Sequence, residues 1–302
     1  MADPDMPSGP RTELVQTTGL RFEVTIAGEG DRLALLLHGF PECSYSWRYQ
    51  IPLLVRLGYR VWAPNLRGYG KSDRPEGVRQ YRIDKLEQDV ADLIDASGAR
   101  SVLLIGHDWG AAIAWNFAMY GSRPLDRLVI MNVPHPARMQ RGLRTLRQLK
   151  KSWYMFFFQV RGLPEMMLAR DDFSAIGRSF RGMAIDKSRF PDEVLAVYRK
   201  NAAEPGALTA MINYYRALPG SFGLARRRGM PRIDLPTLLV WGEEDSALGK
   251  ELTFGTEDHV ADLTVRYLPN VSHWVQQEAP ETVNAMLEAW LTGETVPQAD
   301  AR

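Results

Sequence analysis

The sequence has very little cysteine and almost no excess of one charge. Its 302 residues include one cysteine, Cys43, which allows no internal disulfide and no metal site built from cysteines. The 37 Lys and Arg residues nearly match the 36 Asp and Glu residues, so the formal net charge is +1. This balance excludes a protein that coats nucleic acid through a basic surface, and we expect no nucleic-acid partner. The cysteine count is typical of a reducing compartment and favours a cytoplasmic protein.

Long apolar runs are missing as well. No run approaches the ~18 apolar residues that a membrane-spanning helix needs, so we expect no stable membrane insertion. The first ten residues, MADPDMPSGP, carry acids and prolines where a signal peptide has basic and then apolar residues. The length suits one large domain with an inserted subdomain, and we expect a monomer or a homodimer.

Short apolar runs alternate with helical patterns over most of the chain. This alternation predicts an α/β fold, in which helices cover both faces of a mostly parallel central sheet. The predicted strands are 33–37, 59–63, 101–105, 128–132, 237–241 and 263–268, preceded by an antiparallel hairpin at 12–27. The predicted helices are 46–57, 83–97, 109–120 and 280–291.

The middle of the chain differs from its flanks in pattern and in charge. It is helical throughout and is interrupted by prolines rather than by strands. Between Pro136 and Arg232 there are 19 basic and 7 acidic residues, whereas the remainder holds 18 basic and 29 acidic residues. We therefore predict a helical cap at 135–232, inserted into an α/β core formed by 1–134 and 233–302.

An aspartate occupies the sharp turn after the predicted strand 101–105. The turn reads GHDWG, with Asp108 at its centre. Parallel sheets bind ligands beyond the carboxyl ends of their strands. Small residues around a polar one allow the strained turn of a nucleophile elbow, which pushes the central side chain outward. The alternative is that Asp108 only caps the following helix, as aspartate often does.

The predicted strand 33–37 runs into the loop HGFP. In hydrolases with a nucleophile elbow, a loop at this position presents a backbone N–H to an anionic oxygen. The predicted donors are the amides of Phe40 and Trp109. We also expect the side chains of His38, Pro41 and Trp109 to contact the substrate.

The last two predicted strands end in an acidic loop and in a histidine. The acidic loop reads GEED, and Asp245 is the predicted acid, with Glu244 as the alternative. His273 follows the final strand. The chain order of nucleophile, acid and histidine is the one that hydrolases with a nucleophile elbow use, and it differs from the order in other triad folds. The sequence therefore predicts a triad of Asp108, Asp245 and His273.

An aspartate nucleophile restricts the substrate to a saturated carbon that bears a leaving group. Attack by the carboxylate leaves an ester, and water then attacks the ester carbonyl. The two backbone amides would stabilise the oxyanion, and His273, oriented by Asp245, would activate the water. Epoxides and alkyl halides both qualify. An opened epoxide needs a proton for its alkoxide, whereas a departing halide needs N–H donors.

The sequence resembles the soluble-type epoxide hydrolases of the α/β-hydrolase fold over most of its length. The motifs that carry this resemblance are HGFPE at 38–42, NLRGYGKSD at 65–73, GHDWG at 106–110, NVPHP at 132–136, WGEED at 241–245 and SHW at 272–274. The resemblance implies an α/β-hydrolase fold with a cap. It also implies hydrolysis of a small-molecule epoxide by water to a vicinal diol, through a covalent ester on Asp108. No cofactor and no metal ion are expected.

That family is known for two cap tyrosines that hold the epoxide oxygen. The matching positions look like Tyr154 and Tyr215, with Tyr214 as the rival of the latter. A phenol with a pKa of ~10 is a suitable donor to a developing alkoxide. We also expect Phe156 and Phe157 of the cap to contact the substrate.

Two alternatives stay open. Haloalkane and haloacid dehalogenases share the fold and the triad, but many haloalkane dehalogenases have an asparagine where this chain has Glu42, and a carboxylate there would repel halide. Fluoroacetate dehalogenases carry an arginine directly after the nucleophile, where this chain has Trp109. A non-catalytic member of the fold that binds a small ligand is the other alternative, and the complete triad argues against it.

Overall fold

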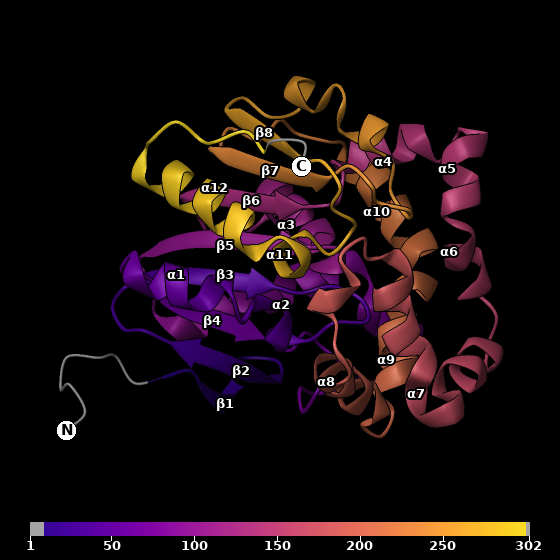
Figure 1. The fold of residues 1–302 in the computed structure, drawn as a ribbon. Coiled ribbons are helices and arrows are strands. Elements are labelled where there is room, and N and C mark those ends of the chain that lie inside the picture. Colours follow the sequence, from indigo (N-terminus) through magenta and orange to yellow (C-terminus); the bar gives the residue numbers. More distant parts are fainter. Residues whose placement is uncertain (1–8, 300–302) are drawn as a thin grey trace.

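A computed structural model describes residues 9–299, in which eight strands form one sheet (Figure 1). The spatial order of the strands is β1-β2-β4-β3-β5-β6-β7-β8. The bounds are β1 (Arg11–Gln16), β2 (Arg21–Ala27), β3 (Arg32–Leu37), β4 (Arg60–Pro64), β5 (Ser101–His107), β6 (Arg127–Met131), β7 (Thr237–Gly242) and β8 (Leu263–Leu268). Strand β2 pairs antiparallel with β1 and β4, and all other pairs are parallel. The predicted hairpin and mostly parallel sheet are confirmed.

Helices cover both faces of this sheet because apolar residues follow one another along each strand. Leu103 and Ile105 of β5 pack in the cluster that includes α1 and α12, while Val102 and Leu104 pack in the cluster that includes α2 and α3. The helices of the core are α1 (Gln50–Arg56), α2 (Ile83–Ser97), α3 (Trp109–Tyr120), α11 (Val275–Glu278) and α12 (Pro280–Thr292). Short 3₁₀ turns lie at Ser44–Trp47, Val78–Tyr81, Lys187–Arg189, Lys250–Thr253 and Thr256–Asp258.

The helix predicted at 46–57 is wrong at its start. The structure has a 3₁₀ turn at Ser44–Trp47 followed by α1, which begins at Gln50. Pro52 explains the break, because its ring would clash with the carbonyl four residues earlier in a helix that began at Ser46. A start at Gln50 places Pro52 in the first turn, where an amide hydrogen is not needed.

Seven helices occupy the chain between β6 and β7 and gather beyond one end of the sheet (Figure 1). They are α4 (Pro136–Gly142), α5 (Leu146–Lys151), α6 (Trp153–Phe157), α7 (Leu163–Met183), α8 (Asp192–Ala203), α9 (Ala207–Arg216) and α10 (Leu218–Arg228). Among the described residues, none of the helices combines the length and the apolar character needed to cross a membrane.

Hydrogen bonds tie this helical segment to the loops at the strand ends. The Tyr214 hydroxyl donates to the carbonyl of Arg67 at 2.8 Å, and the Lys151 ammonium donates to the carbonyl of Asp245 at 2.9 Å. Both acceptors are backbone atoms of loops that follow strands. The helices are thereby fixed over the edge of the sheet where the predicted catalytic side chains lie.

Candidate active site

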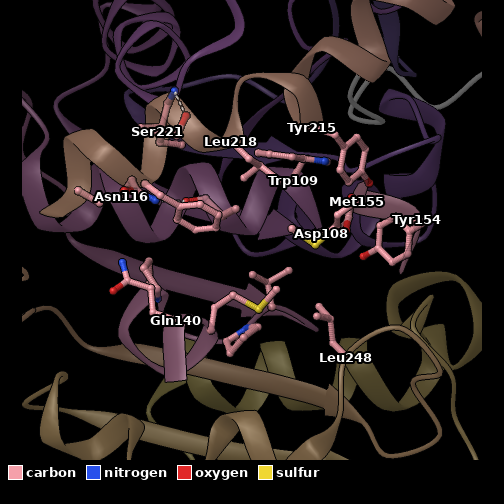
Figure 2. Close-up of a pocket in the computed structure, with 18 residues that line it drawn as sticks. Asp108, Trp109, Asn116, Gln140, Tyr154, Met155, Tyr215, Leu218, Ser221 and Leu248 are labelled. Atoms are coloured by element: carbon pink, nitrogen blue, oxygen red, sulfur yellow. Dashed lines mark hydrogen bonds between the residues drawn. The ribbon is translucent and has the colours of Figure 1, made fainter. Parts of the chain in front are cut away.

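Asp108 stands at the turn between β5 and α3 in a backbone conformation that side chains rarely adopt. Its φ is 47°, in the left-handed region, and the residue precedes the first turn of α3. Two glycines allow the backbone to make this tight turn. A Cβ on Gly106 would lie 2.5 Å from the carbonyl oxygen of Gly110, and a Cβ on Gly110 would lie 2.0 Å from that of Leu37. The turn is therefore built by close backbone approach, and it directs the Asp108 side chain into a cavity (Figure 2).

The two carboxylate oxygens of Asp108 have different partners. Oδ1 accepts a hydrogen bond from the amide of Phe40 at 2.7 Å, and Oδ2 lies 3.4 Å from Nε2 of His273. Burial alone would raise the pKa of Asp108, but the hydrogen bond and charge of His273 outweigh it and lower that pKa. Asp108 is thus an ionised carboxylate at neutral pH, with one oxygen on a backbone donor and the other facing the imidazole.

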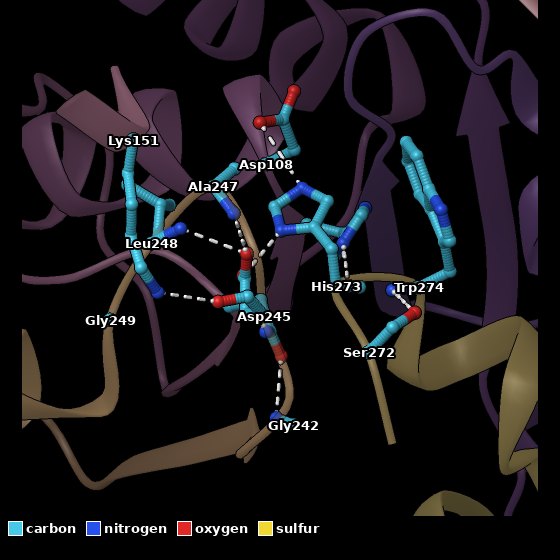
Figure 3. Close-up of polar contacts among 12 residues, drawn as sticks. Asp108, Lys151, Gly242, Asp245, Ala247, Leu248, Gly249, Ser272, His273 and Trp274 are labelled. Carbon is cyan, nitrogen blue, oxygen red and sulfur yellow. Dashed lines mark hydrogen bonds and ion pairs between the residues drawn. The ribbon is translucent and has the colours of Figure 1, made fainter. Parts of the chain in front are cut away.

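His273 lies between two carboxylates (Figure 3). Its Nδ1 is 2.6 Å from Oδ2 of Asp245. Burial alone would lower the pKa of His273, but the charges and hydrogen bonds of Asp245 and Asp108 raise it to about 10. The resting site therefore holds an imidazolium ion, which is paired with Asp108 on one side and with Asp245 on the other.

Of the two predicted acids, the structure brings Asp245 to the histidine. Asp245 is buried, whereas Glu244 is exposed. The Asp245 carboxylate is fixed by three further donors, all at 2.8 Å: the side-chain amide of Asn132 and the backbone amides of Ala247 and Leu248. These bonds orient the carboxylate toward Nδ1 of the histidine without adding a charge.

Asn132 is a site residue for which the sequence alone predicted no role, although it begins the NVPHP motif. It follows β6 with a φ of 49°, which asparagine tolerates better than most residues. Its side-chain oxygen accepts from the amide of Gly242 at 2.9 Å while its side-chain amide donates to Asp245. One signal could have indicated this role: the asparagine ends a central strand, and the neighbouring strands carry the acid and the nucleophile.

Glu42 belongs to a buried network beneath the site. Its Oε2 accepts from the amide of Gly39 and lies 2.8 Å from Nδ1 of His107, and its Oε1 accepts from two glutamine side chains of α11. Nε2 of His107 in turn lies 2.8 Å from the carbonyl oxygen of His273. The side chain of Glu42 is fully buried and does not line the cavity. This carboxylate therefore faces the protein interior, and the repulsion of a halide by its charge stays a prediction.

The cavity brings two of the predicted tyrosines to Asp108. Tyr154 and Tyr215 line it, and their ring centroids are 5.8 Å apart. Burial, together with the charge of Asp108, raises the pKa of both phenols, so both stay protonated. Tyr214, the predicted rival, is fully buried and bonded to the backbone of Arg67, outside the cavity.

The other predicted substrate contacts, His38, Pro41, Phe156 and Phe157, are not among the residues that line this cavity, and their contact with substrate stays a prediction. His38 is fully buried, where Nε2 accepts from the amide of Leu66 and Nδ1 donates to a neighbouring carbonyl. Burial lowers its pKa to about 4, so this ring is a neutral support for the loop. Phe156 is 60% exposed and faces solvent. Trp109 lines the cavity as predicted.

No group of three or more His, Cys, Asp or Glu side chains within residues 9–299 is arranged to hold a metal ion. The polar groups around Asp108 are instead bonded directly to one another. Carboxylate, imidazole and backbone amide are the kinds of group from which a nucleophile, a base and an oxyanion site can be built.

Comparisons with known proteins agree with this geometry. A family model described as "alpha/beta hydrolase fold" matches residues 35–280. AB hydrolase superfamily protein YfhM from Bacillus subtilis (strain 168) is 38% identical over 286 residues, covering 94% of this chain and 98% of that protein. Epoxide hydrolase 4 from Mus musculus is 38% identical over 288 residues, covering 93% of this chain and 79% of that protein.

A solved structure shows the same likeness in three dimensions. The crystal structure of epoxide hydrolase A from Mycobacterium thermoresistibile has a TM-score of 0.83 and 32% sequence identity, and the match covers 95% of this chain and 100% of that chain. Fold, site geometry and sequence identity therefore agree that this chain belongs to the α/β-hydrolase fold family and, within it, to the epoxide hydrolases.

Proposed function

We propose that the protein hydrolyses an epoxide to a vicinal diol through a covalent ester on Asp108. One observation carries this proposal: the ionised Asp108 carboxylate has one oxygen on the Phe40 amide and the other facing His273, in a cavity lined by two protonated phenols. The epoxide hydrolases among the relatives and structural neighbours support the same reaction class. The partners are a small-molecule epoxide and water.

The first step opens the ring. The phenols of Tyr154 and Tyr215 donate to the epoxide oxygen, while Oδ2 of Asp108 attacks a ring carbon and the C–O bond on the far side breaks. One phenol gives its proton to the alkoxide. The phenolate regains a proton through solvent as the His273 imidazolium loses one. The products are a hydroxyalkyl ester on Asp108 and a neutral imidazole.

The second step hydrolyses this ester. An esterified Asp108 has no charge, so one of the two causes that raise the pKa of His273 disappears and the imidazole is a base at neutral pH. His273, still bonded to Asp245, takes a proton from water as the water attacks Cγ of Asp108. Oδ1 becomes the oxyanion and stays on the Phe40 amide, with the Trp109 amide as the second donor. The intermediate collapses as the His273 imidazolium protonates the departing alkoxide, and the diol leaves. The proton left on the Asp108 carboxyl group passes to His273, which restores the carboxylate and the imidazolium ion.

A pH change should separate the two steps. Ring opening needs ionised Asp108, whose pKa is lowered, so it should persist in acid. Ester hydrolysis needs neutral His273, whose pKa the charge and hydrogen bond of Asp245 raise, so this step should slow as the pH falls. We expect the ester to occupy most of the enzyme at pH 5 and little of it at pH 9. Acid quench and intact-protein mass spectrometry during turnover measure this fraction, and equal occupancy at both pH values would contradict the assigned base.

Removing one cavity phenol should slow ring opening. Tyr154→Phe and Tyr215→Phe should each lower the single-turnover rate of ester formation by roughly 10- to 100-fold, because each removes one donor to the developing alkoxide. Tyr214→Phe is the matched control, since it deletes a phenol that donates to the backbone of Arg67. This control should lose about 1 kcal/mol of stability and keep its rate within about twofold. A rate loss in Tyr214→Phe as large as in Tyr215→Phe would show that the assignment is wrong.

Paired substrate panels test the proposed function against its alternatives. Terminal epoxides and chloro- or bromoalkanes of matched carbon skeletons are offered to the wild-type enzyme, and diol and halide release are assayed together. We expect diol from the epoxides at a rate at least about tenfold above halide release. Halide release without diol would identify a dehalogenase, and tight binding without either product would identify a binding protein.

A further inference from the structure

The cavity that holds Asp108 extends from it in one direction, along α3 (Figure 2). Three residues of this helix line it: Trp109, Ala112 and Asn116. Because a helix rises 1.5 Å per residue, the eight residues from Asp108 to Asn116 span about 12 Å. Figure 2 shows Asp108, Tyr154 and Tyr215 at one end and Asn116 with Gln140 at the other. The reacting carbon would therefore lie at one end of a channel about two helical turns long.

Two helices of the inserted segment form the opposite walls of this channel. The lining residues of α10 follow helical spacing, so one face of that helix is turned toward the channel. From α10 these are Leu218, Ser221, Phe222 and Ala225, and from α4 they are Pro136, Met139 and Gln140. The cavity has a volume of about 130 Å³. A space of this volume along three helix faces is narrow, and it suits an unbranched chain.

Packed rings lie near Asp108 outside the lining of the channel. Phe40 and Phe158 are 5.4 Å apart by ring centroids, and Phe158 lies 4.9 Å from the ring of Tyr215. Beyond His273, the rings of Phe180 and Trp274 are 4.4 Å apart and both are buried. None of these phenylalanine and tryptophan rings lines the cavity. The lining therefore provides space for one long substituent, which lies along α3.

The chemistry of the channel wall favours an uncharged chain. Of the described residues that line it, none is Lys, Arg or His, and Asp108 is the one carboxylate. The polar side chains other than the catalytic phenols lie toward the far end, at Asn116, Gln140 and Ser221 (Figure 2). The amide of Asn116 donates to the carbonyl of Ala112, which leaves its side-chain oxygen as an acceptor. An ionised group on the chain would therefore lose solvation and meet no opposite charge among the residues that line the channel.

We propose that the substrate is a terminal epoxide with one long, unbranched and uncharged arm, which lies in the channel along α3 while the oxirane reaches Asp108. This proposal rests on the proposed epoxide hydrolysis and deepens it to a substrate class. Ala112 sets the width of the channel at its middle. Asn116 and Gln140 meet the far end of the arm, where a hydroxyl group is accepted and a carboxylate is not.

A series of unbranched 1,2-epoxyalkanes, from 1,2-epoxypropane upward, tests the length of the arm. We expect kcat/KM to rise up to about fourfold per added methylene group, the factor for transfer of one CH₂ from water, until the channel is full, and then to stop rising. The trans internal epoxide has the same number of carbons, but its substituents are divided between both ring carbons. Its kcat/KM should be at least about tenfold lower than that of the terminal epoxide. Among arms of equal length, a terminal carboxylate should lower kcat/KM at least about tenfold relative to a terminal hydroxyl.

The series also separates this inference from the proposed function. If no epoxide of any length gives a diol, the proposed epoxide hydrolysis fails. Two results would overturn the substrate class but leave the proposed epoxide hydrolysis intact. In one, the short epoxides give diols but kcat/KM does not change with chain length. In the other, the trans isomers react as fast as the terminal epoxides.

A variant that narrows the channel gives a second, independent measurement. Ala112→Leu should abolish the gain in kcat/KM from methylene groups that reach past residue 112. Ala203→Leu is the matched control, because Ala203 is exposed on α8 and lines no part of the channel, and it should keep the wild-type chain-length dependence. Thermal unfolding shows whether both variants fold. If Ala112→Leu does not fold, the chain-length series measured on the wild-type enzyme decides the proposal. A wild-type slope in folded Ala112→Leu would overturn the channel assignment.

Discussion

Asp108→Asn should lower kcat/KM for an epoxide by about 10⁴-fold or more, as expected when a covalent nucleophile is removed. The asparagine side chain has nearly the same shape, and its oxygen can still accept from the Phe40 amide. Its amide nitrogen, however, carries no charge and does not attack a saturated carbon. Diol formation at substrate concentrations well below KM measures the loss, and intact mass spectrometry should find no adduct on the variant.

The same variant should change the titration of His273. The charge and hydrogen bond of Asp108 are among the causes that raise the pKa of this imidazole to about 10, so their removal should lower it. Imidazole NMR signals followed with pH measure the shift. Asp95→Asn is a matched control, because Asp95 pairs with Arg123 on the surface, away from the cavity, and should leave both activity and this pKa unchanged. If Asp108→Asn keeps more than a tenth of the activity, the nucleophile is a different group.

The sequence predicted the parts of the site that local patterns determine. Strand periodicity located the strand ends, and the glycines of the GHDWG turn are needed for close backbone approach wherever the turn forms. Parallel strands bring their carboxyl ends to one edge, so the chain order of Asp108, Asp245 and His273 was enough to predict that they meet. The sequence predicted Asp245 and kept Glu244 as the alternative, and burial and the Asn132 bond distinguish these two neighbours, which look alike in sequence.

The structure was needed for side chains whose roles depend on long-range packing. Glu42 looks like a residue of the substrate loop, yet the amide of Gly39 and His107 hold its carboxylate beneath that loop. Phe156 belongs to an aromatic run that suggests a cavity wall, but it lies on the solvent side of a short helix. The channel itself is formed by faces of α3, α4 and α10, and which faces meet depends on tertiary packing that no local pattern specifies.

His273→Gln should stop the reaction after ring opening and leave the ester on the enzyme. Glutamine cannot act as the base for water, while the Phe40 amide and the two cavity phenols remain in place for the first step. We expect about one equivalent of adduct per active site, with the mass of the substrate, and steady-state turnover reduced by on the order of 10³-fold or more. The reaction is run at pH 8, because loss of the imidazolium leaves burial to raise the pKa of Asp108.

The position of the adduct and the fate of water decide between this mechanism and direct attack of water on the epoxide. His259→Gln is the control, since His259 stacks on His135 outside the cavity and should give no adduct. Peptide mapping should place the His273→Gln adduct on Asp108. In a single wild-type turnover in ¹⁸O-labelled water, attack at Cγ puts the label into the Asp108 carboxylate, because the new diol oxygen comes from Oδ2. Label found only in the diol would mean that water opens the ring directly, and that Asp108 and His273 act on water rather than on an ester.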